Sequence, residues 1–294
     1  MPMIRALCTD AGKDLTEYSR WLWRAGIAHR ISEEAGQQVL WLADESAVDF
    51  AKTALEAFER GELETEGGQQ PTLDIDSSGV FGMLIKHPVT IALIALTAGV
   101  AILSRFGADP AWVHWLSFSD FELVAGYPYF LPLSQSLDAG QWWRFLTPVF
   151  LHFSGLHLVF NMLWLLILGG RIEQYRGGLF LLLLVVVIGI TSNLTQYLFS
   201  IDHPLFGGFS GVVYGLLGFC WIYSYYLPSA GLAQPRAVIG FMVGWLLVCF
   251  TGILEVVGFG AIANAAHTAG LVSGCVLGGI YGYSRRQQRM REES

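Results

Sequence analysis

The sequence predicts an α-helical polytopic membrane protein with six transmembrane helices, preceded by a small N-terminal α/β cytoplasmic domain. Three observations predict this fold. Hydrophobic residues make up 53% of the 294-residue chain and charged residues only 14%, whereas a soluble domain carries about 25% charged residues. The charged residues gather at the two ends of the chain. Between them lie six apolar stretches, each close to the roughly 20 helical residues that cross a hydrocarbon core.

The first 65 residues have the pattern of a small soluble α/β domain. Residues 3–9 alternate as a strand does, and 38–43 form an apolar run typical of another strand. Helical spacing of apolar residues appears over 15–28 and again over 46–60. We therefore expect a cytoplasmic α/β domain over residues 1–65.

The stretch that follows is polar and acidic and has no period, which is typical of a linker. We expect a linker over 66–86, a six-helix domain over 87–284 and a basic cytoplasmic tail over 285–294.

Six helices are expected in the second domain because a backbone in lipid has no water to bond and must satisfy its own polar groups. Their ends are set by the apolar composition. The expected helices cover roughly 88–105, 148–169, 178–199, 209–227, 237–256 and 263–283.

Charges in the connecting loops predict the orientation, because positive loops stay on the cytoplasmic side of a membrane. The opposite loops are mainly acidic, and the long 106–147 segment carries several tryptophans, which suits the outer membrane interface. Both termini are then cytoplasmic. The cations that set this orientation are Arg171, Arg176, Arg236, Arg285, Arg286, Arg289 and Arg291.

Four polar residues from three of the expected helices share one depth below the outer surface. With this topology the second, fourth and sixth helices all run inward, and polar groups inside a membrane need partners and a purpose. Ser210 begins the fourth helix, His267 lies in the first turns of the sixth, and His157 and Asn161 share one face of the second.

Small residues allow the fourth and sixth helices to approach closely, since ridges of small residues let membrane helices pack backbone to backbone. Ser210 and His267 both lie beside these ridges, so a distance of ~3 Å between hydroxyl and imidazole is possible. The ridges consist of Gly211, Gly215 and Gly218 on one helix and Ala266, Gly270, Gly274, Gly278 and Gly282 on the other.

A serine and a histidine in this arrangement are suited to nucleophilic catalysis. Neutral histidine is the side chain that can take the serine proton near neutral pH. The free N–H of Ser210 at a helix start, and the Asn161 side chain, could stabilise an oxyanion. The first turns of the sixth helix hold no Asp or Glu, so we expect a Ser–His dyad, with Tyr214 stacking on the imidazole.

Other chemistries fit the sequence less well. His152, His157 and His267 could in principle bind a metal, but no acidic or thiolate ligand lies at matching depth. The four cysteines lack metal-site spacing and no disulfide framework is indicated. We expect neither a metal nor a cofactor. The net charge of -7 argues against a nucleic-acid partner.

Four motifs, in this order, resemble the rhomboid family of intramembrane serine proteases, in its bacterial GlpG type. The resemblance covers nearly the whole chain, and 41–46 resembles the cytosolic domain of that type. One departure is Pro148, which stands where a histidine is common. The motifs are Gln141-Trp142-Trp143-Arg144, His152-Phe153-Ser154-Gly155-Leu156-His157-Leu158-Val159-Phe160-Asn161, Gly208-Phe209-Ser210-Gly211 and Ala266-His267-Thr268-Ala269-Gly270.

The resemblance implies a role for each matching residue. Ser210 would be the nucleophile and His267 its base, with His157, Asn161 and the Ser210 amide as the oxyanion hole. Further roles are implied for a second set of residues. The dyad would be supported by Tyr214, Gly208 and Gly211, and lateral substrate entry would be gated by Phe160, Trp164 and Trp245. The outer loop would be embedded in the membrane interface by Trp143 and Arg144, and the structural carboxylate would be Glu173.

The resemblance also implies an endopeptidase of the bacterial inner membrane that cleaves single-span membrane proteins near the outer, periplasmic boundary. Membrane lipid is then a second partner. One alternative is a silent rhomboid-like protein that binds membrane clients, although such proteins usually lack the serine or the histidine. A transporter with a histidine relay would need intramembrane carboxylates and paired repeats, and the sequence has neither. Natural substrates, the oligomeric state and the role of residues 1–70 stay open.

Overall fold

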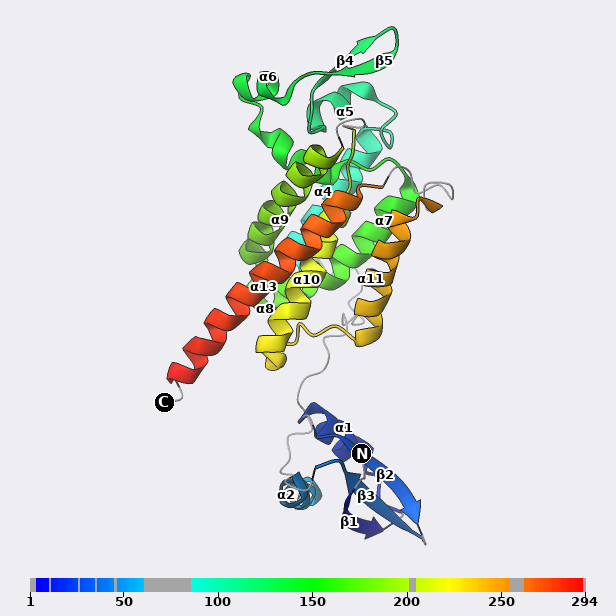
Figure 1. The fold of residues 1–294 in the computed structure, drawn as a ribbon, viewed down its shortest axis with the longest axis vertical. Coiled ribbons are helices and arrows are strands. Elements are labelled where there is room, and N and C mark those ends of the chain that lie inside the picture. The colour runs from blue at the N-terminus through cyan, green and yellow to red at the C-terminus, as the bar shows by residue number, and fades with distance from the viewer. Residues whose placement is uncertain are drawn as a thin grey trace. The chain divides into compact units, whose positions relative to one another are not determined.

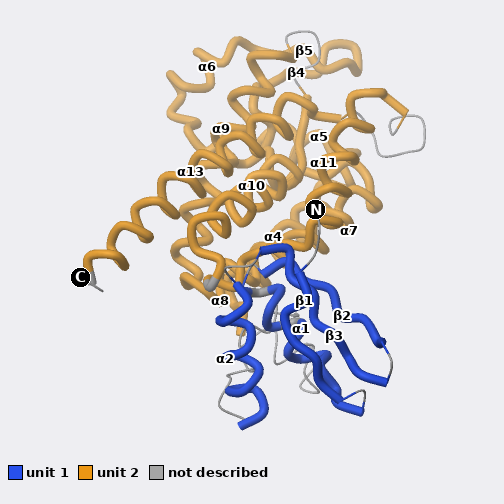
Figure 2. Tube along the Cα trace, turned by 60° about the horizontal axis from the view of Figure 1, so that its bottom comes forward, with its two compact units in different colours: residues 1–69 blue, residues 70–294 orange. Residues whose placement is uncertain are grey.

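The chain forms two compact units, residues 1–69 and 70–294, which Figure 2 shows in different colours and which are described separately. The computed structural model describes residues 4–10, 12–25, 27–34, 36–44, 47–60, 86–200, 205–253 and 262–292. The expected linker, 66–86, lies almost wholly outside the described residues.

The N-terminal unit packs two helices on a three-stranded antiparallel sheet whose strand order is β1-β3-β2. Its core consists of apolar residues from both helices and all three strands. The α/β character predicted from the sequence is confirmed, but β2 was missed because its sequence, HRISEE, is largely polar. The elements are β1 (Ile4–Asp10), α1 (Thr16–Arg24), β2 (His29–Glu34), β3 (Gln37–Leu42) and α2 (Val48–Glu59).

The second unit is mainly a bundle of long helices, shown in Figure 1. Its second helix is continuous through a π-helical turn, η4, so that α7, η4 and α8 form one rod. The bundle consists of α4 (Pro88–Leu103), α7 (Gly155–Trp164), η4 (Leu165–Gly169), α8 (Gly170–Arg176), α9 (Gly178–Phe199), α10 (Ser210–Tyr226), α11 (Arg236–Phe250) and α13 (Asn264–Glu292).

Short elements fill the long connection between α4 and α7, and one more turn joins α10 to α11. Two strands of this connection pair as an antiparallel hairpin. These elements are α5 (Pro110–Leu116), β4 (Phe121–Val124), β5 (Tyr127–Phe130), α6 (Leu133–Asp138), η2 (Trp142–Phe145), η3 (Thr147–Phe150) and η5 (Pro228–Ala230).

Three expected helices had wrong boundaries. The helix expected over 148–169 begins at Gly155, because Ser154 caps it by accepting from the His157 amide, and it ends at Arg176, directly before Gly177. The expected tail, 285–294, is largely part of α13, which stays helical to Glu292. The helix expected over 237–256 ends at Phe250 as α11, and residues 254–261 lie outside the described residues.

Within the described part of the chain, two helical segments are long and apolar enough to cross a membrane, namely Gly155–Arg176 and Gly178–Phe199. Pro88–Leu103 and Arg236–Phe250 are apolar but shorter. The mainly helical fold with apolar helices is therefore confirmed, while the number of six crossings and their orientation stay predictions.

The backbones of α10 and α13 lie in direct contact, side by side in the bundle (Figure 1). A Cβ added to Gly270 would lie 2.0 Å from the Gly211 carbonyl oxygen, and one on Gly274 only 1.9 Å from that of Gly215. No side chain fits at these positions. The spacing of small residues therefore decides how close the start of α10 comes to the start of α13.

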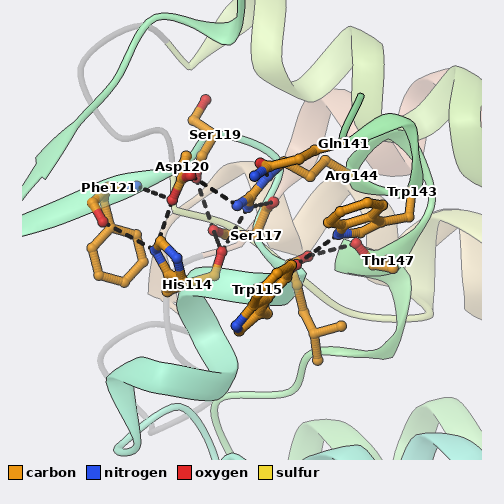
Figure 3. Close-up of polar contacts among 11 residues, drawn as sticks. His114, Trp115, Ser117, Ser119, Asp120, Phe121, Gln141, Trp143, Arg144 and Thr147 are labelled. Carbon is orange, nitrogen blue, oxygen red and sulfur yellow. Dashed lines mark hydrogen bonds and ion pairs between the residues drawn. The ribbon is translucent and has the colours of Figure 1, made fainter. Parts of the chain in front are cut away.

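Arg144 lies at the centre of the contacts within the connection between α4 and α7, as Figure 3 shows. Its Nη1 donates to the carbonyls of His114 (2.6 Å) and Ser117 (2.9 Å), and its Nη2 pairs with Asp120 Oδ2 at 3.1 Å. Its Nε donates to Gln141 Oε1 at 2.6 Å. Burial lowers the pKa of Arg144 and the Asp120 carboxylate opposes that shift. The buried, paired guanidinium thus joins the end of α5, Asp120 just before β4, and η2.

Candidate active site

Ser210 and His267 meet at the starts of α10 and α13. The Ser210 Oγ and the His267 Nε2 lie 2.6 Å apart, within hydrogen-bond distance. His267 is buried, with 5% of its surface exposed. A hydroxyl and an imidazole in this geometry can exchange a proton directly.

The turn before α10 depends on glycine. Gly208 has φ +130, which side chains rarely adopt, and a Cβ there would lie 2.6 Å from His157 Cε1. Its amide donates to the Pro148 carbonyl at 3.0 Å. Gly208 thus lets the chain pass directly beside His157 and start α10 at Ser210.

The imidazole of His267 is held by packing rather than by a carboxylate. Among the described residues its Nδ1 has no hydrogen-bond partner. The Tyr214 ring lies against it, with centroids 5.1 Å apart and planes tilted by 41°. The first turn of α13 is fixed from α9, because the Ala266 amide donates to Gln196 Oε1 at 2.9 Å. This role of Gln196 was not predicted from the sequence, since one glutamine in an apolar helix carries no periodic signal.

Asn161 is buried on α7, and its Nδ2 lies 2.9 Å from the Nε2 of the fully buried His152. The His152 Nδ1 lies 3.3 Å from the Phe150 carbonyl, so this nitrogen carries the proton and Nε2 accepts. His152, considered above as a metal ligand, therefore orients Asn161. Among the described residues, no group of three or more His, Cys, Asp or Glu side chains could hold a metal.

An open cavity adjoins the dyad. Polar groups gather at one part of it and aromatic side chains form much of its wall, so it suits an apolar segment that presents a polar backbone to Ser210. The polar lining is His157, Asn161, Ser210 and His267, and the apolar lining includes Phe160, Trp164, Phe241, Met242 and Trp245.

The residues implied as a gate lie between α7 and α11. Phe160 and Trp245 stack with centroids 6.1 Å apart and planes at 10°. The ring centroids of Trp164 and Phe241 lie 6.3 Å apart, and Phe241 in turn stacks on Trp245 with a centroid distance of 6.0 Å. Phe241 was missed from the sequence, where a phenylalanine in an apolar helix looks like ordinary packing.

Comparison with domain families and with individual proteins gives consistent similarities. Residues 139–284 match the Rhomboid domain, and residues 1–68 match the Rhomboid N-terminal domain. The chain is 33% identical over 285 residues to "Rhomboid protease GlpG" of Serratia proteamaculans (strain 568), covering 94% of this chain and 95% of that protein. It is also 33% identical over 261 residues to the protein of that name from Yersinia pestis (strain Pestoides F), covering 85% and 87% of the two chains.

Proposed function

The chain belongs to the rhomboid family of intramembrane serine proteases, and on that premise we propose that Ser210 and His267 are its catalytic dyad. The single observation that carries the proposal is the 2.6 Å contact between the Ser210 Oγ and the His267 Nε2. The pair lies at the start of two tightly packed helices, beside a cavity lined by apolar side chains.

In this mechanism His267 Nε2 takes the proton from Ser210 Oγ as the oxygen attacks the scissile carbonyl carbon. The tetrahedral intermediate breaks when His267 returns that proton to the leaving amine, and an acyl-enzyme remains on Ser210. Water then attacks the acyl carbon while His267 takes its proton, and the bond to Ser210 breaks as His267 returns that proton to the Ser210 Oγ, which releases the carboxylic acid product and restores the free serine.

Three donors would stabilise the oxyanion. The Ser210 amide is the first of α10 and therefore has no partner within the helix. Asn161 and His157 line the same cavity. Each positioned donor of this kind is typically worth about 3 kcal/mol in the transition state.

Membrane proteins are the substrate class of the family, and the finer specificity is part of the proposal. The bulk of the cavity is apolar and the dyad lies at the helix starts, beside the long outer connection. This supports cleavage of a single-span segment near the outer membrane boundary, in an inner-membrane protein with six crossings and both termini in the cytoplasm.

A fluorophosphonate serine-hydrolase probe tests the dyad in detergent micelles. Labelling should disappear in Ser210→Ala and in His267→Ala. The control Ser273→Ala removes another α13 hydroxyl, which bonds to the Gly270 carbonyl, and should label like the wild type. Persistent labelling of Ser210→Ala would refute the assignment. A folded wild type that takes up no probe would favour the client-binding alternative.

A further inference from the structure

α11 is docked on the bundle by one narrow face. Of its 15 residues only Met242, Leu246 and Cys249 are buried, and a Cβ on Gly240 or Gly244 would meet nothing within 4 Å. Figure 1 shows α11 at the edge of the bundle, beside α7. A helix held this way can move with little loss of buried contact.

Two side chains donate hydrogen bonds to backbone carbonyls on that docked face. The Tyr214 hydroxyl donates to the Met242 carbonyl at 3.1 Å, and the Asn264 Nδ2 donates to the Cys249 carbonyl at 3.2 Å. Cys249 lies in the last turn of α11, where carbonyls lack full partners within the helix. Asn264 thus helps cap α11 from the neighbouring helix α13.

Both donors also lie close to His267. The Tyr214 ring lies against that imidazole at 5.1 Å. Asn264 begins α13 three residues before His267, so the two occupy adjacent positions on one side of the first turn. Because the His267 Nδ1 has no hydrogen-bond partner in the described part of the chain, the orientation of the imidazole depends on its contact with Ser210 and on these neighbours.

We propose that Tyr214 and Asn264 are positioning residues that couple the docking of α11 to the alignment of His267. When α11 is docked, both donors are bonded and the imidazole is held toward Ser210. When α11 moves away from α7 to admit a substrate helix, both acceptors leave with it and the imidazole loses that hold. The dyad is then fully aligned only after α11 has returned. This inference rests on the proposed function of Ser210 and His267.

The test uses Tyr214→Phe, which keeps the ring and loses the hydroxyl, and Asn264→Leu, which keeps the side-chain size and loses the donor. Two readouts are taken on the full chain in detergent. Hydrogen–deuterium exchange of 236–250 measures the docking of α11. Phosphonylation by a fluorophosphonate probe is resolved into the probe's binding constant and its maximal rate constant.

Both variants should speed exchange in α11 several-fold and lower the maximal phosphonylation rate about three- to tenfold, with the binding constant unchanged. A merely destabilised protein would instead lose labelled fraction at an unchanged rate. Two controls should leave both readouts as in the wild type. Tyr225→Phe removes an exposed hydroxyl from α10, and Thr191→Val removes a hydroxyl of α9 that donates to the Val187 carbonyl.

Faster exchange with an unchanged phosphonylation rate would overturn the coupling, as would a slower rate with unchanged exchange. Failure of the proposed function is distinguishable, because the wild type itself would then take up no probe, while the exchange measurement would still report on the two hydrogen bonds.

Discussion

At the scale of one residue, Asn161 is held in place by a neighbour and is also a proposed oxyanion donor. Its amide points to His152, which is buried and accepts through Nε2. An amide nitrogen has two hydrogens, so the contact to His152 leaves one for a developing oxyanion. In the proposed oxyanion hole, this contact with His152 would place the second hydrogen without further reorganisation during the reaction.

Asn161→Ala should therefore lower the maximal phosphonylation rate roughly 100-fold or more, the typical effect of losing one oxyanion donor. His152→Phe should lower it less, because it removes only the support. Rates are measured with the fluorophosphonate probe, and thermal unfolding checks that both variants fold. Equal rates in Asn161→Ala and wild type would contradict the role of Asn161.

Tyr18 makes the stability of the N-terminal unit sensitive to alkaline pH. It is fully buried, its hydroxyl donates to the Ala51 carbonyl at 2.6 Å, and burial raises its pKa to about 12. The folded unit therefore holds this proton more firmly than the unfolded chain does. The resulting stability is complete below about pH 10, the ordinary tyrosine pKa, and is lost as pH rises toward 12.

Urea unfolding of residues 1–69 should show this loss between pH 9 and 11.5. Tyr18→Phe should unfold about 1 kcal/mol more easily at neutral pH, because it lacks the hydrogen bond, and should lack this part of the alkaline loss. Tyr18 is the only tyrosine before residue 70, so tyrosinate absorbance reports its ionisation directly. A normal titration near pH 10 in the folded unit would contradict the burial effect.

At the scale of elements, the contact between α10 and α13 depends on glycines spaced four residues apart. Gly274 faces the Gly215 carbonyl, whereas an added Cβ on Gly279 would meet only Ile222 Cγ2, at 3.6 Å. The two glycines lie on the same helix and differ only in what they face. Substituting each of them with alanine therefore separates the effect of helix–helix packing from the effect of helix propensity.

Gly274→Ala should lower the thermal unfolding temperature and the fluorophosphonate labelling rate together, because separating the helices moves His267 away from Ser210. Gly279→Ala should leave both nearly unchanged. Unfolding and labelling are measured on the purified protein in detergent. Similar effects of the two substitutions would show that close backbone contact is not what aligns the dyad.

At the scale of the whole molecule, the two compact units have separate cores. All hydrogen bonds described here around Ser210, His267 and Asn161 lie within residues 70–294. We therefore expect the geometry of the proposed dyad to be independent of the first unit.

Removal of residues 1–69 should leave the phosphonylation rate constant within about twofold of that of the full chain in detergent. The measurement compares both proteins at equal concentration of folded material. A large loss would show that the N-terminal unit acts on the dyad.

Features that depend on local pattern could be predicted before the fold was known. Apolar composition predicted the bundle, the glycine spacing predicted which two helices lie closest, and the Gly208–Gly211 motif placed a serine at the start of α10. Shared depth predicted that Ser210 and His267 lie together, and the structure has their side chains 2.6 Å apart. Such patterns repeat along one helix, so they are legible without the fold.

The pairing of polar groups across elements could not be predicted from the sequence, because it depends on how the helices pack in three dimensions. Gln196 holds the first turn of α13, His152 holds Asn161, and Tyr214 reaches the Met242 carbonyl in α11. Each contact joins helices or loops that are separate in the chain, or depends on where a helix begins, as with α7 at Gly155 rather than 148. A single polar side chain has no period, so its partner is set by the packing of the bundle around it.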